Sequence, residues 1–284
     1  LYMGTDNGIL VYNYRADRYE QPATDFPTDV RTMALQGDTL WIGALNGLYT
    51  YQLQNRKLSP LDTKRNGLPH NTIYSIIRTG DNQIYVGTYN GLCRYIASNG
   101  KFEKIPLPVN SSQSNLFVNS LLEDTGRQCI WIGTEGYLFQ YFPSTGQMKQ
   151  TEAFHNNSIK SLALDGNGDL LAGTDNGLYV YHNDVTPLQH IIHDSRNIQS
   201  LTYNIIWNIF ADQEHNIWLG TDYGISLSRY NSALQFIPIS QITGTGDGNQ
   251  FYSLFRDSKG FYWFGGTNGL IRFTDPAGDK HNAI

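Results

Sequence analysis

Six short segments of the chain share the pattern apolar–X–polar, and the residue at X differs from segment to segment. The residues at X are Arg31, Tyr74, Asn119, Lys160, Trp207 and Tyr252. Aromatic, amide and basic side chains at one repeated position suit a sugar, because the apolar faces of a sugar stack on rings and its hydroxyl groups pair with amides. Arg31 and Lys160 add cations that would pair with a uronate or a sulfate. The pattern therefore predicts a site for an oligosaccharide.

A second repeated position lies two residues before the apolar residue of each segment. It holds Thr28, Asn71, Leu116, Asn157, Asn204 and Asn249. Asn71 and Asn204 are further candidates for ligand binding, because amides donate and accept hydrogen bonds. The alternative is that the side chains at both positions only pack between neighbouring sheets or cap the ends of inner strands.

The sequence predicts no catalytic residue, no metal site and no cofactor. His190 and His193 are three residues apart, which on a strand places them on opposite faces, so they do not share a metal ion. Glu123, Asp124 and Glu135 are the nearest approach to paired carboxylates for glycoside hydrolysis, but adjacent strand residues diverge. The arginines are scattered and do not recur at one repeat position, as a lyase or sialidase would require.

Composition limits the class of partner. The 284 residues carry a formal net charge of −5 without charged blocks, which argues against a nucleic-acid partner. The two cysteines, Cys93 and Cys129, lack metal-site spacing and are expected to be buried, unpaired thiols. Neither a signal peptide nor a transmembrane run is present. The chain opens in the middle of a repeat and is expected to be an excerpt of a longer protein.

The elements that position the candidate residues come from an internal repeat such as Leu171–Tyr179, Leu-Ala-Gly-Thr-Asp-Asn-Gly-Leu-Tyr. Its first glycine recurs as Gly4, Gly43, Gly87, Gly133, Gly173, Gly220 and Gly265. Each copy predicts two strands joined by a tight turn, often Asn-Gly. The Asp and Asn of the repeat are expected to form turns, and the copy at Gly133–Gly136 is one residue short.

One full repeat predicts four strands, at Val30–Leu35, Thr39–Gly43, Leu48–Tyr51 and around Lys57–Leu61. Seven such units predict an all-β fold, a seven-bladed β-propeller of four-stranded antiparallel blades over residues 1–284. The first unit lacks its first strand and the last lacks a clear fourth, so both terminal blades are expected to be incomplete. The alternative is that a boundary between two propellers falls inside the chain.

The connections of a four-stranded meander alternate between its two ends. The Gly-rich turns and the long variable connections between units should therefore share one end, where ligand chemistry is expected. The turns between first and second strands carry Asp, as in Asp165–Gly168 and Asp257–Gly260. They are similar to the Asp-box of sialidases, but we interpret them as turns beside a core tryptophan, since Trp263 follows Gly260 by three residues.

Segments of the form Trp-Ile-Gly-Thr-x-x-Gly-Leu, preceded by Asp-x-x-Gly, resemble the two-component regulator propeller repeat. The stretches His193–Leu201 and Asn66–Ile73 are similar to linkers in the sensor domains of Bacteroides-type hybrid two-component systems. The resemblance covers essentially the whole chain. It implies a periplasmic sensor of two seven-bladed propellers and a β-sandwich, joined through one membrane helix to a histidine kinase and a response regulator. Such sensors detect glycan breakdown products.

The sequence therefore leaves three functional hypotheses. The favoured one is a non-enzymatic, extracytoplasmic sensor propeller that binds a glycan-derived oligosaccharide, packs on a second propeller and relays the signal to a kinase module outside this chain. In the second, this propeller is a scaffold that packs on its neighbour or a homodimer mate while another domain binds the ligand. The third is a polysaccharide lyase or sialidase-like enzyme.

Overall fold

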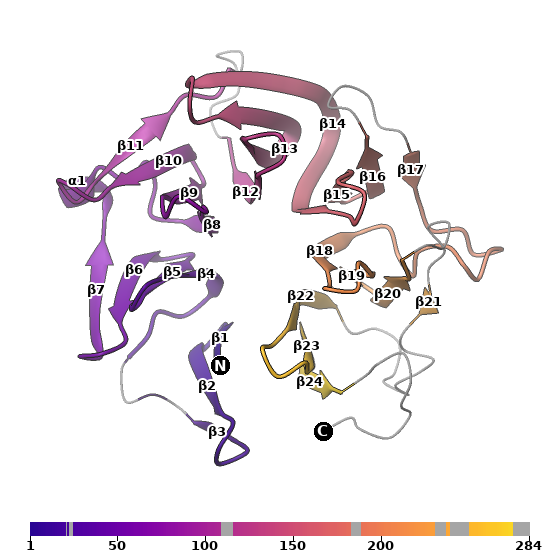
Figure 1. Cartoon of the computed structure of the whole chain (residues 1–284), viewed down its shortest axis with the longest axis horizontal. Coiled ribbons are helices and arrows are strands. Elements are labelled where there is room, and N and C mark those ends of the chain that lie inside the picture. The colour runs from indigo at the N-terminus through magenta and orange to yellow at the C-terminus, as the bar shows by residue number, and fades with distance from the viewer. Residues whose placement is uncertain are drawn as a thin grey trace. The chain divides into compact units, whose positions relative to one another are not determined.

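The computed structural model describes residues 1–20, 22, 25–108, 116–182, 189–230, 237–238 and 250–274, without the side chains of 151–156 and 237–238 (Figure 1). The chain falls into two compact units, each described by itself. The first unit is Leu1–Glu123 with Tyr141–Met148, and the second is Asp124–Gln140 with Lys149–Ile284. No helix in the described part is long and apolar enough to cross a membrane. A single propeller domain over 1–284 stays a prediction.

The first unit contains three antiparallel meanders and one short helix. Its first sheet has the order β1-β2-β3: β1 (Tyr2–Thr5), β2 (Gly8–Asn13) and β3 (Arg18–Glu20). The second sheet follows the order β4-β5-β6-β7: β4 (Val30–Gln36), β5 (Thr39–Ala44), β6 (Gly47–Gln52) and β7 (Lys57–Leu61). After the four-residue helix α1 (Thr63–Asn66), the third sheet comprises β8 (Ile73–Arg78), β9 (Ile84–Thr88), β10 (Gly91–Ile96) and β11 (Lys101–Ile105).

The next sheet has six strands in sequence order, and the division between the units runs through its first three. They are β12 (Val118–Asp124), β13 (Cys129–Phe142), β14 (Gln147–Leu164), β15 (Leu170–Thr174), β16 (Gly177–Tyr181) and β17 (Gln189–Ile191). Two more meanders complete the second unit. They are β18 (Ile206–Ala211), β19 (Ile217–Thr221), β20 (Gly224–Ser228) and β21 (Ile237–Pro238), then β22 (Phe251–Arg256), β23 (Tyr262–Gly266) and β24 (Gly269–Phe273).

The all-β class and the meander order confirm the prediction, and the first and last sheets have three strands each. One expectation is wrong: the fourth and fifth units are not two separate four-stranded sheets. In the copy at Gly133–Gly136 the second glycine comes one residue early, but Thr134 Oγ1 still donates to the carbonyl of Tyr137 at 2.9 Å, as in the other turns. β13 runs through this segment as one strand, and β14 continues from the fourth unit into the fifth. The described residues thus form six sheets. Leu188, Phe236 and Ile239, which were predicted at strand ends, lie outside the described residues.

The apolar core lies between neighbouring sheets. In the first unit, Trp41, Ile73 and Val86 belong to one buried cluster, and β4 and β8 lie side by side (Figure 1). The second strands β9, β15 and β19 are buried along their whole length, so both of their faces are covered. This explains why these strands read as continuous apolar runs rather than as alternating patterns.

The first glycine of the repeat is required where neighbouring sheets approach closely. A Cβ on Gly43 would lie 2.6 Å from Cγ2 of Ile73 in the next sheet. In the second unit, a Cβ on Gly220 would lie 2.5 Å from the carbonyl oxygen of Phe251. A side chain would therefore push the sheets apart, which is why the repeat keeps glycine there.

The aspartates that begin the first turns hold core tryptophans, as predicted. The buried indoles of Trp131, Trp218 and Trp263 donate to Asp124, Asp212 and Asp257 at 3.0, 2.8 and 2.7 Å. The Asp257 carboxylate also accepts the amide of Phe261 in its own turn at 3.0 Å. These carboxylates are engaged in holding turn and core together.

Candidate ligand-binding site

The variable position of the inner strands is the extra residue of a recurring β-bulge. In five sheets, two successive residues of the second strand pair with residues of the first strand that are two positions apart, so one residue of the first strand is left without a partner. The skipped residues are Arg31, Tyr74, Lys160, Trp207 and Tyr252. A bulged residue has no ladder partner, and its side chain is aimed away from the regular alternation. Asn119 occupies the equivalent position of β12 and is half-buried.

Hydroxyl groups of the next repeat position tie successive sheets together beside the bulges. Ser161 Oγ accepts the amide of Ile209 at 2.9 Å, and Thr32 Oγ1 accepts that of Ile76 at 3.2 Å. Ser75 instead donates to the carbonyl of Val118 at 3.1 Å. The backbone beside the Tyr74 and Trp207 bulges is therefore held by Thr32 and Ser161 of the preceding sheet, and the bulged side chains take no part in these contacts.

The Gly-rich turns are held by threonine rather than by the Asp that follows it. Thr174 Oγ1 accepts the amide of Asn176 at 3.0 Å and donates to the carbonyl of Gly177 at 2.9 Å. Thr5, Thr88 and Thr221 make the same two hydrogen bonds. The expectation that the repeat Asp is only a turn former is wrong for Asp175 and Asp222, because their carboxylates bind bulge residues.

In the second unit, Lys160 and Trp207 form the centre of a polar and aromatic row. Lys160 Nζ lies 3.0 Å from Asp175 Oδ1 and 4.1 Å from the ring centroid of Trp207. Trp207 Nε1 donates to Asp222 Oδ1 at 2.5 Å. An ammonium over an indole face is an attractive cation–π contact, so Lys160 is held by a carboxylate and a ring together.

The row continues into the last sheet through Gln250 and Tyr252. Gln250 Nε2 donates to Asp222 Oδ1 at 3.0 Å, and the Tyr252 hydroxyl donates to Gln250 Oε1 at 2.5 Å. The rings of Trp207 and Tyr252 meet edge to face, with centroids 5.1 Å apart. Tyr252 remains 41% exposed. We call Lys160, Asp175, Trp207, Asp222, Gln250 and Tyr252 the inner-strand row.

The first unit holds an aromatic group at the corresponding place. Tyr74 meets Phe117 edge to face at 5.9 Å, Phe117 meets Tyr89 at 4.3 Å, and Tyr89 lies 4.8 Å from the His70 ring. Tyr89 comes from a Gly-rich turn and His70 from a connection between sheets, which agrees with the prediction that these segments share one end. Tyr74 thus lies at one end of a row of ring contacts that runs through Phe117 and Tyr89 to His70.

The remaining predicted residues lie elsewhere or have other duties. Arg31 and Asn71 are exposed and make no ion pair or side-chain hydrogen bond with the described residues. Asn204 Oδ1 accepts the amide of His193 at 2.6 Å, and its carbonyl accepts the amide of Gly177 at 2.7 Å. Asn204 therefore anchors the connection that precedes β18.

The two histidines weighed as a metal pair have separate partners. His190 stacks on Tyr179 with centroids 4.1 Å apart, and its Nε2 lies 2.6 Å from the carbonyl oxygen of Asn176. His193 Nδ1 lies 2.6 Å from the carbonyl oxygen of Leu201. Within the described ranges, no group of three or more His, Cys, Asp or Glu side chains is placed to hold a metal ion.

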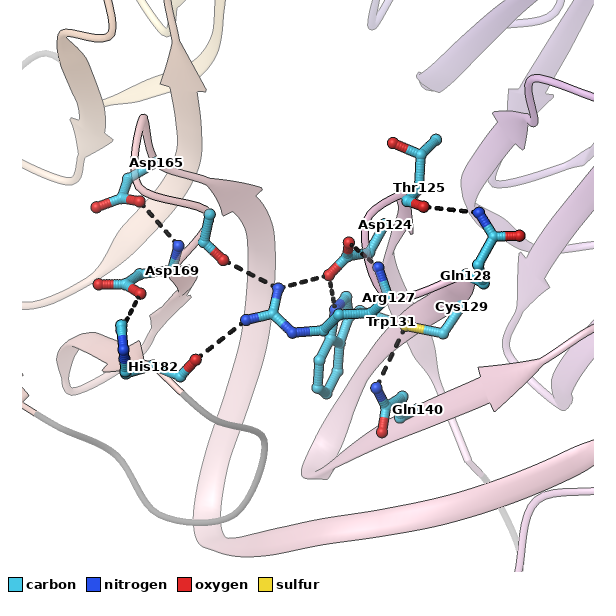
Figure 2. A network of polar contacts seen from close by, with 11 residues as sticks. Asp124, Thr125, Arg127, Gln128, Cys129, Trp131, Gln140, Asp165, Asp169 and His182 are labelled. Atoms are coloured by element: carbon cyan, nitrogen blue, oxygen red, sulfur yellow. Dashed lines mark hydrogen bonds and ion pairs between the residues drawn. The ribbon is translucent and has the colours of Figure 1, made fainter.

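Of the carboxylates weighed for hydrolysis, Glu123 and Asp124 make structural contacts, and Glu135 is exposed. Asp124 accepts the indole of Trp131 and an Arg127 guanidinium hydrogen bond at 2.8 Å, and Arg127 reaches on to the carbonyls of Gly168 and His182 (Figure 2). Burial raises the pKa of Asp124, but these hydrogen bonds outweigh it and hold that pKa below its usual value. Glu123, next along the chain, accepts the amide of Gly80 at 2.9 Å.

Sequence reasoning missed Asp175, Asp222 and Gln250. A signal for the two aspartates was present, because the position after the turn threonine varies between repeats as much as the bulge position does. It holds Asp6, Leu45, Tyr89, Glu135, Asp175, Asp222 and Thr267. Gln250 lies just before the first strand of its unit, where other units hold Asp29, Thr72 and Ile205, and the contacts of its side chain identify it.

Comparison with known proteins confirms the resemblance drawn from the repeats. The model of the two-component regulator propeller family matches residues 67–90, 200–223 and 245–268. The chain carries two-component regulator propeller repeats. The matched segments include two of the Gly-rich turns that supply the row and the aromatic group, at Tyr89 and Asp222.

Solved structures and one curated relative are similar to this chain. Two crystal structures of the extracellular domain of BT4673 from B. thetaiotaomicron, a putative one-component or hybrid two-component system, are 92% identical, with a TM-score of 0.79. They cover 100% of this chain, which spans 38% of theirs. Histidine kinase P4 of Formosa agariphila is 28% identical, over 96% of this chain and 21% of that protein.

A more distant structure shows the fold alone. The virginiamycin B lyase of Staphylococcus aureus is 15% identical with a TM-score of 0.69, over 94% of this chain and 87% of that one. Its fold similarity supports blades of the β-propeller type and carries no information on activity.

Proposed function

We propose that this chain is an extracytoplasmic sensor propeller that binds a glycan-derived oligosaccharide at the inner-strand row. The observation that carries the proposal is the bulge: a rigid, repeated device presents Lys160, Trp207 and Tyr252 out of the strand alternation, beside the variable turn residues Asp175 and Asp222. Bulges that re-aim side chains are over-represented at functional sites. We propose as well that the propeller has seven blades.

The chemistry of the row suits a sugar. Tyr252 offers a partly exposed ring for stacking against the apolar face of a pyranose. Asp222 Oδ1 is occupied by Trp207 and Gln250, while no hydrogen bond to its Oδ2 comes from the described residues. A carboxylate oxygen in this state is an acceptor for a hydroxyl hydrogen. A ring beside an acceptor is the minimum that orients one sugar unit.

The surroundings of the chain are inferred from its relatives. The 92% identical structure is an extracellular domain, which supports a periplasmic location, and the curated relative is a histidine kinase. We infer that a second propeller and a kinase module belong to the same protein, with a homodimer as the signalling form. A ligand that binds one arrangement of these parts better than another shifts the kinase equilibrium by that difference in affinity.

Calorimetry of the complete extracytoplasmic part with a panel of oligosaccharides tests the proposal. Tyr252→Ala and Trp207→Ala should weaken binding by about tenfold or more, since ring stacking and its support are lost. Tyr223→Ala, which removes an exposed ring outside the row, should leave the affinity unchanged. Circular dichroism confirms folding. Unaltered binding by all three variants would mean that this propeller is a scaffold.

The same titrations examine the first-unit aromatic group. Tyr74→Ala is expected to weaken ligand binding without unfolding the domain, because Tyr74 occupies the bulge position and contacts Phe117 only edge to face. If Tyr74→Ala leaves the affinity at the wild-type value while Trp207→Ala lowers it, the ligand contacts the second unit alone.

A further inference from the structure

The charges of the inner-strand row bear on which class of sugar it accepts. The row contains one lysine and two aspartates, so it carries one net negative charge at neutral pH. The cation of the row already has partners within it. Lys160 is ion-paired with Asp175 at 3.0 Å, lies over the Trp207 ring, and its side chain is 17% exposed. Asp175 is held in turn, because its Oδ2 accepts the amide of Ser158 at 3.3 Å.

From this geometry we propose, building on the proposed function, that the row selects electrically neutral sugar units and rejects uronates and sulfated sugars. An anionic group that reached Lys160 would lie beside the Asp175 carboxylate, which is already paired with that ammonium. Like charges placed together are disfavoured and are a common means of rejecting a wrong ligand. Lys160 thus has a structural role within the inner-strand row.

Asp222 acts in the same direction. Its Oδ1 is fixed by Trp207 and Gln250, and its carboxylate accepts hydrogen bonds but donates none. A hydroxyl group satisfies this acceptor, whereas a carboxylate or sulfate brings more acceptors and a second negative charge. A neutral hydroxyl-rich unit therefore matches the row, and Asp222 sets the preference jointly with Asp175.

An array of neutral, uronate-bearing and sulfated oligosaccharides, probed with the complete extracytoplasmic part, tests the proposal. We expect binders only among the neutral sugars, with an affinity that changes less than about threefold between low and high salt, since no ligand charge is screened. Asp222→Asn should weaken the neutral binder by about tenfold. Asp175→Asn, which frees Lys160 without changing the size of the side chain, should admit uronate-bearing sugars.

The outcomes separate the two proposals. Tight binding of a uronate or sulfated sugar that Lys160→Met abolishes overturns the neutral preference and leaves the sensor function standing. An array on which nothing binds, with Trp207→Ala indistinguishable from the wild type, overturns both. Gln250→Glu adds a negative charge within the row and serves as the matched control, because in the Asp175→Asn background it should reverse the gain in affinity for anionic sugars.

Discussion

Loss of the Arg127 side chain should lower the free energy of unfolding of the second unit. It donates to Asp124, whose side chain is 2% exposed, and to the carbonyls of Gly168 and His182 at 2.9 and 3.1 Å (Figure 2). The charge-assisted bond is worth about 1.5–3 kcal/mol and each carbonyl bond about 0.5–1.5 kcal/mol. Asp124 keeps its other hydrogen bonds in Arg127→Met, so we expect a loss of about 3 kcal/mol.

A second arginine in the same kind of place provides the control. Arg256 pairs with Glu214 at 2.5 Å between neighbouring first turns, but the Glu214 side chain is 54% exposed. Exposed ion pairs contribute about 0–1 kcal/mol, so Arg256→Met should cost about 1 kcal/mol at most. Concentrated salt should reduce this smaller loss and leave most of the larger one, because the pair around Asp124 is covered.

Urea unfolding followed by circular dichroism and tryptophan fluorescence measures both losses. The free energy of unfolding should fall about three times as far in Arg127→Met as in Arg256→Met, with an unchanged dependence on urea concentration. Equal losses in the two variants, or a loss in Arg127→Met that concentrated salt removes, would refute the reasoning. A double-mutant cycle with Asp124→Asn should then give a coupling of about 2 kcal/mol, since the two groups share one charge-assisted bond.

Three further predictions follow from the contacts between sheets. Gly220→Ala should destabilise the protein by about 1–3 kcal/mol, because its Cβ would meet backbone at 2.5 Å, whereas Gly80→Ala, with its nearest atom 3.7 Å away, should be close to neutral in urea unfolding. Ser161→Ala leaves the amide of Ile209 without its acceptor, so that amide should exchange hydrogen faster and stability should fall by about 1–3 kcal/mol. The native pKa of Asp124 is lowered, so its contribution is present at neutral pH and is lost as pH falls below about 3.9 through that native pKa. Asp124→Asn should flatten this acid-side loss of thermal stability.

Repetition made the strand order predictable from sequence. Each copy repeats the same glycine, turn and strand pattern, so an ambiguous copy can be interpreted by comparison with the others. Outside the fourth copy, the described strands lie where the pattern places them. The fourth copy shows the limit of this reasoning. The closer spacing of the two glycines at Gly133–Gly136 predicts a distorted turn, but it does not predict that β13 and β14 each become one long strand. That outcome depends on pairing between strands far apart in sequence.

The candidate site was predictable only in part, for a physical reason. Variation at one repeat position indicates that a side chain is not needed by the scaffold, and this identified Lys160, Trp207 and Tyr252. It does not show which neighbours the side chain meets. The pairing of Lys160 with Asp175 and of Trp207 with Asp222 depends on the bulge, and a bulge leaves no mark in the alternation of a five- or six-residue strand.

The repeat divides structural and binding duties between positions. Glycine permits the close approach of sheets, threonine closes the turn, and Ser161 or Thr32 holds the backbone beside the next bulge. With the backbone satisfied by these constant residues, the bulged residue and the turn residue after threonine can change together without loss of fold. Asp175 with Lys160, and Asp222 with Trp207, are two results of this freedom. We therefore expect the ligand specificity of such a propeller to change blade by blade, because each pair lies on one sheet, while Ser161, which holds the backbone beside the Trp207 bulge, lies on the preceding sheet.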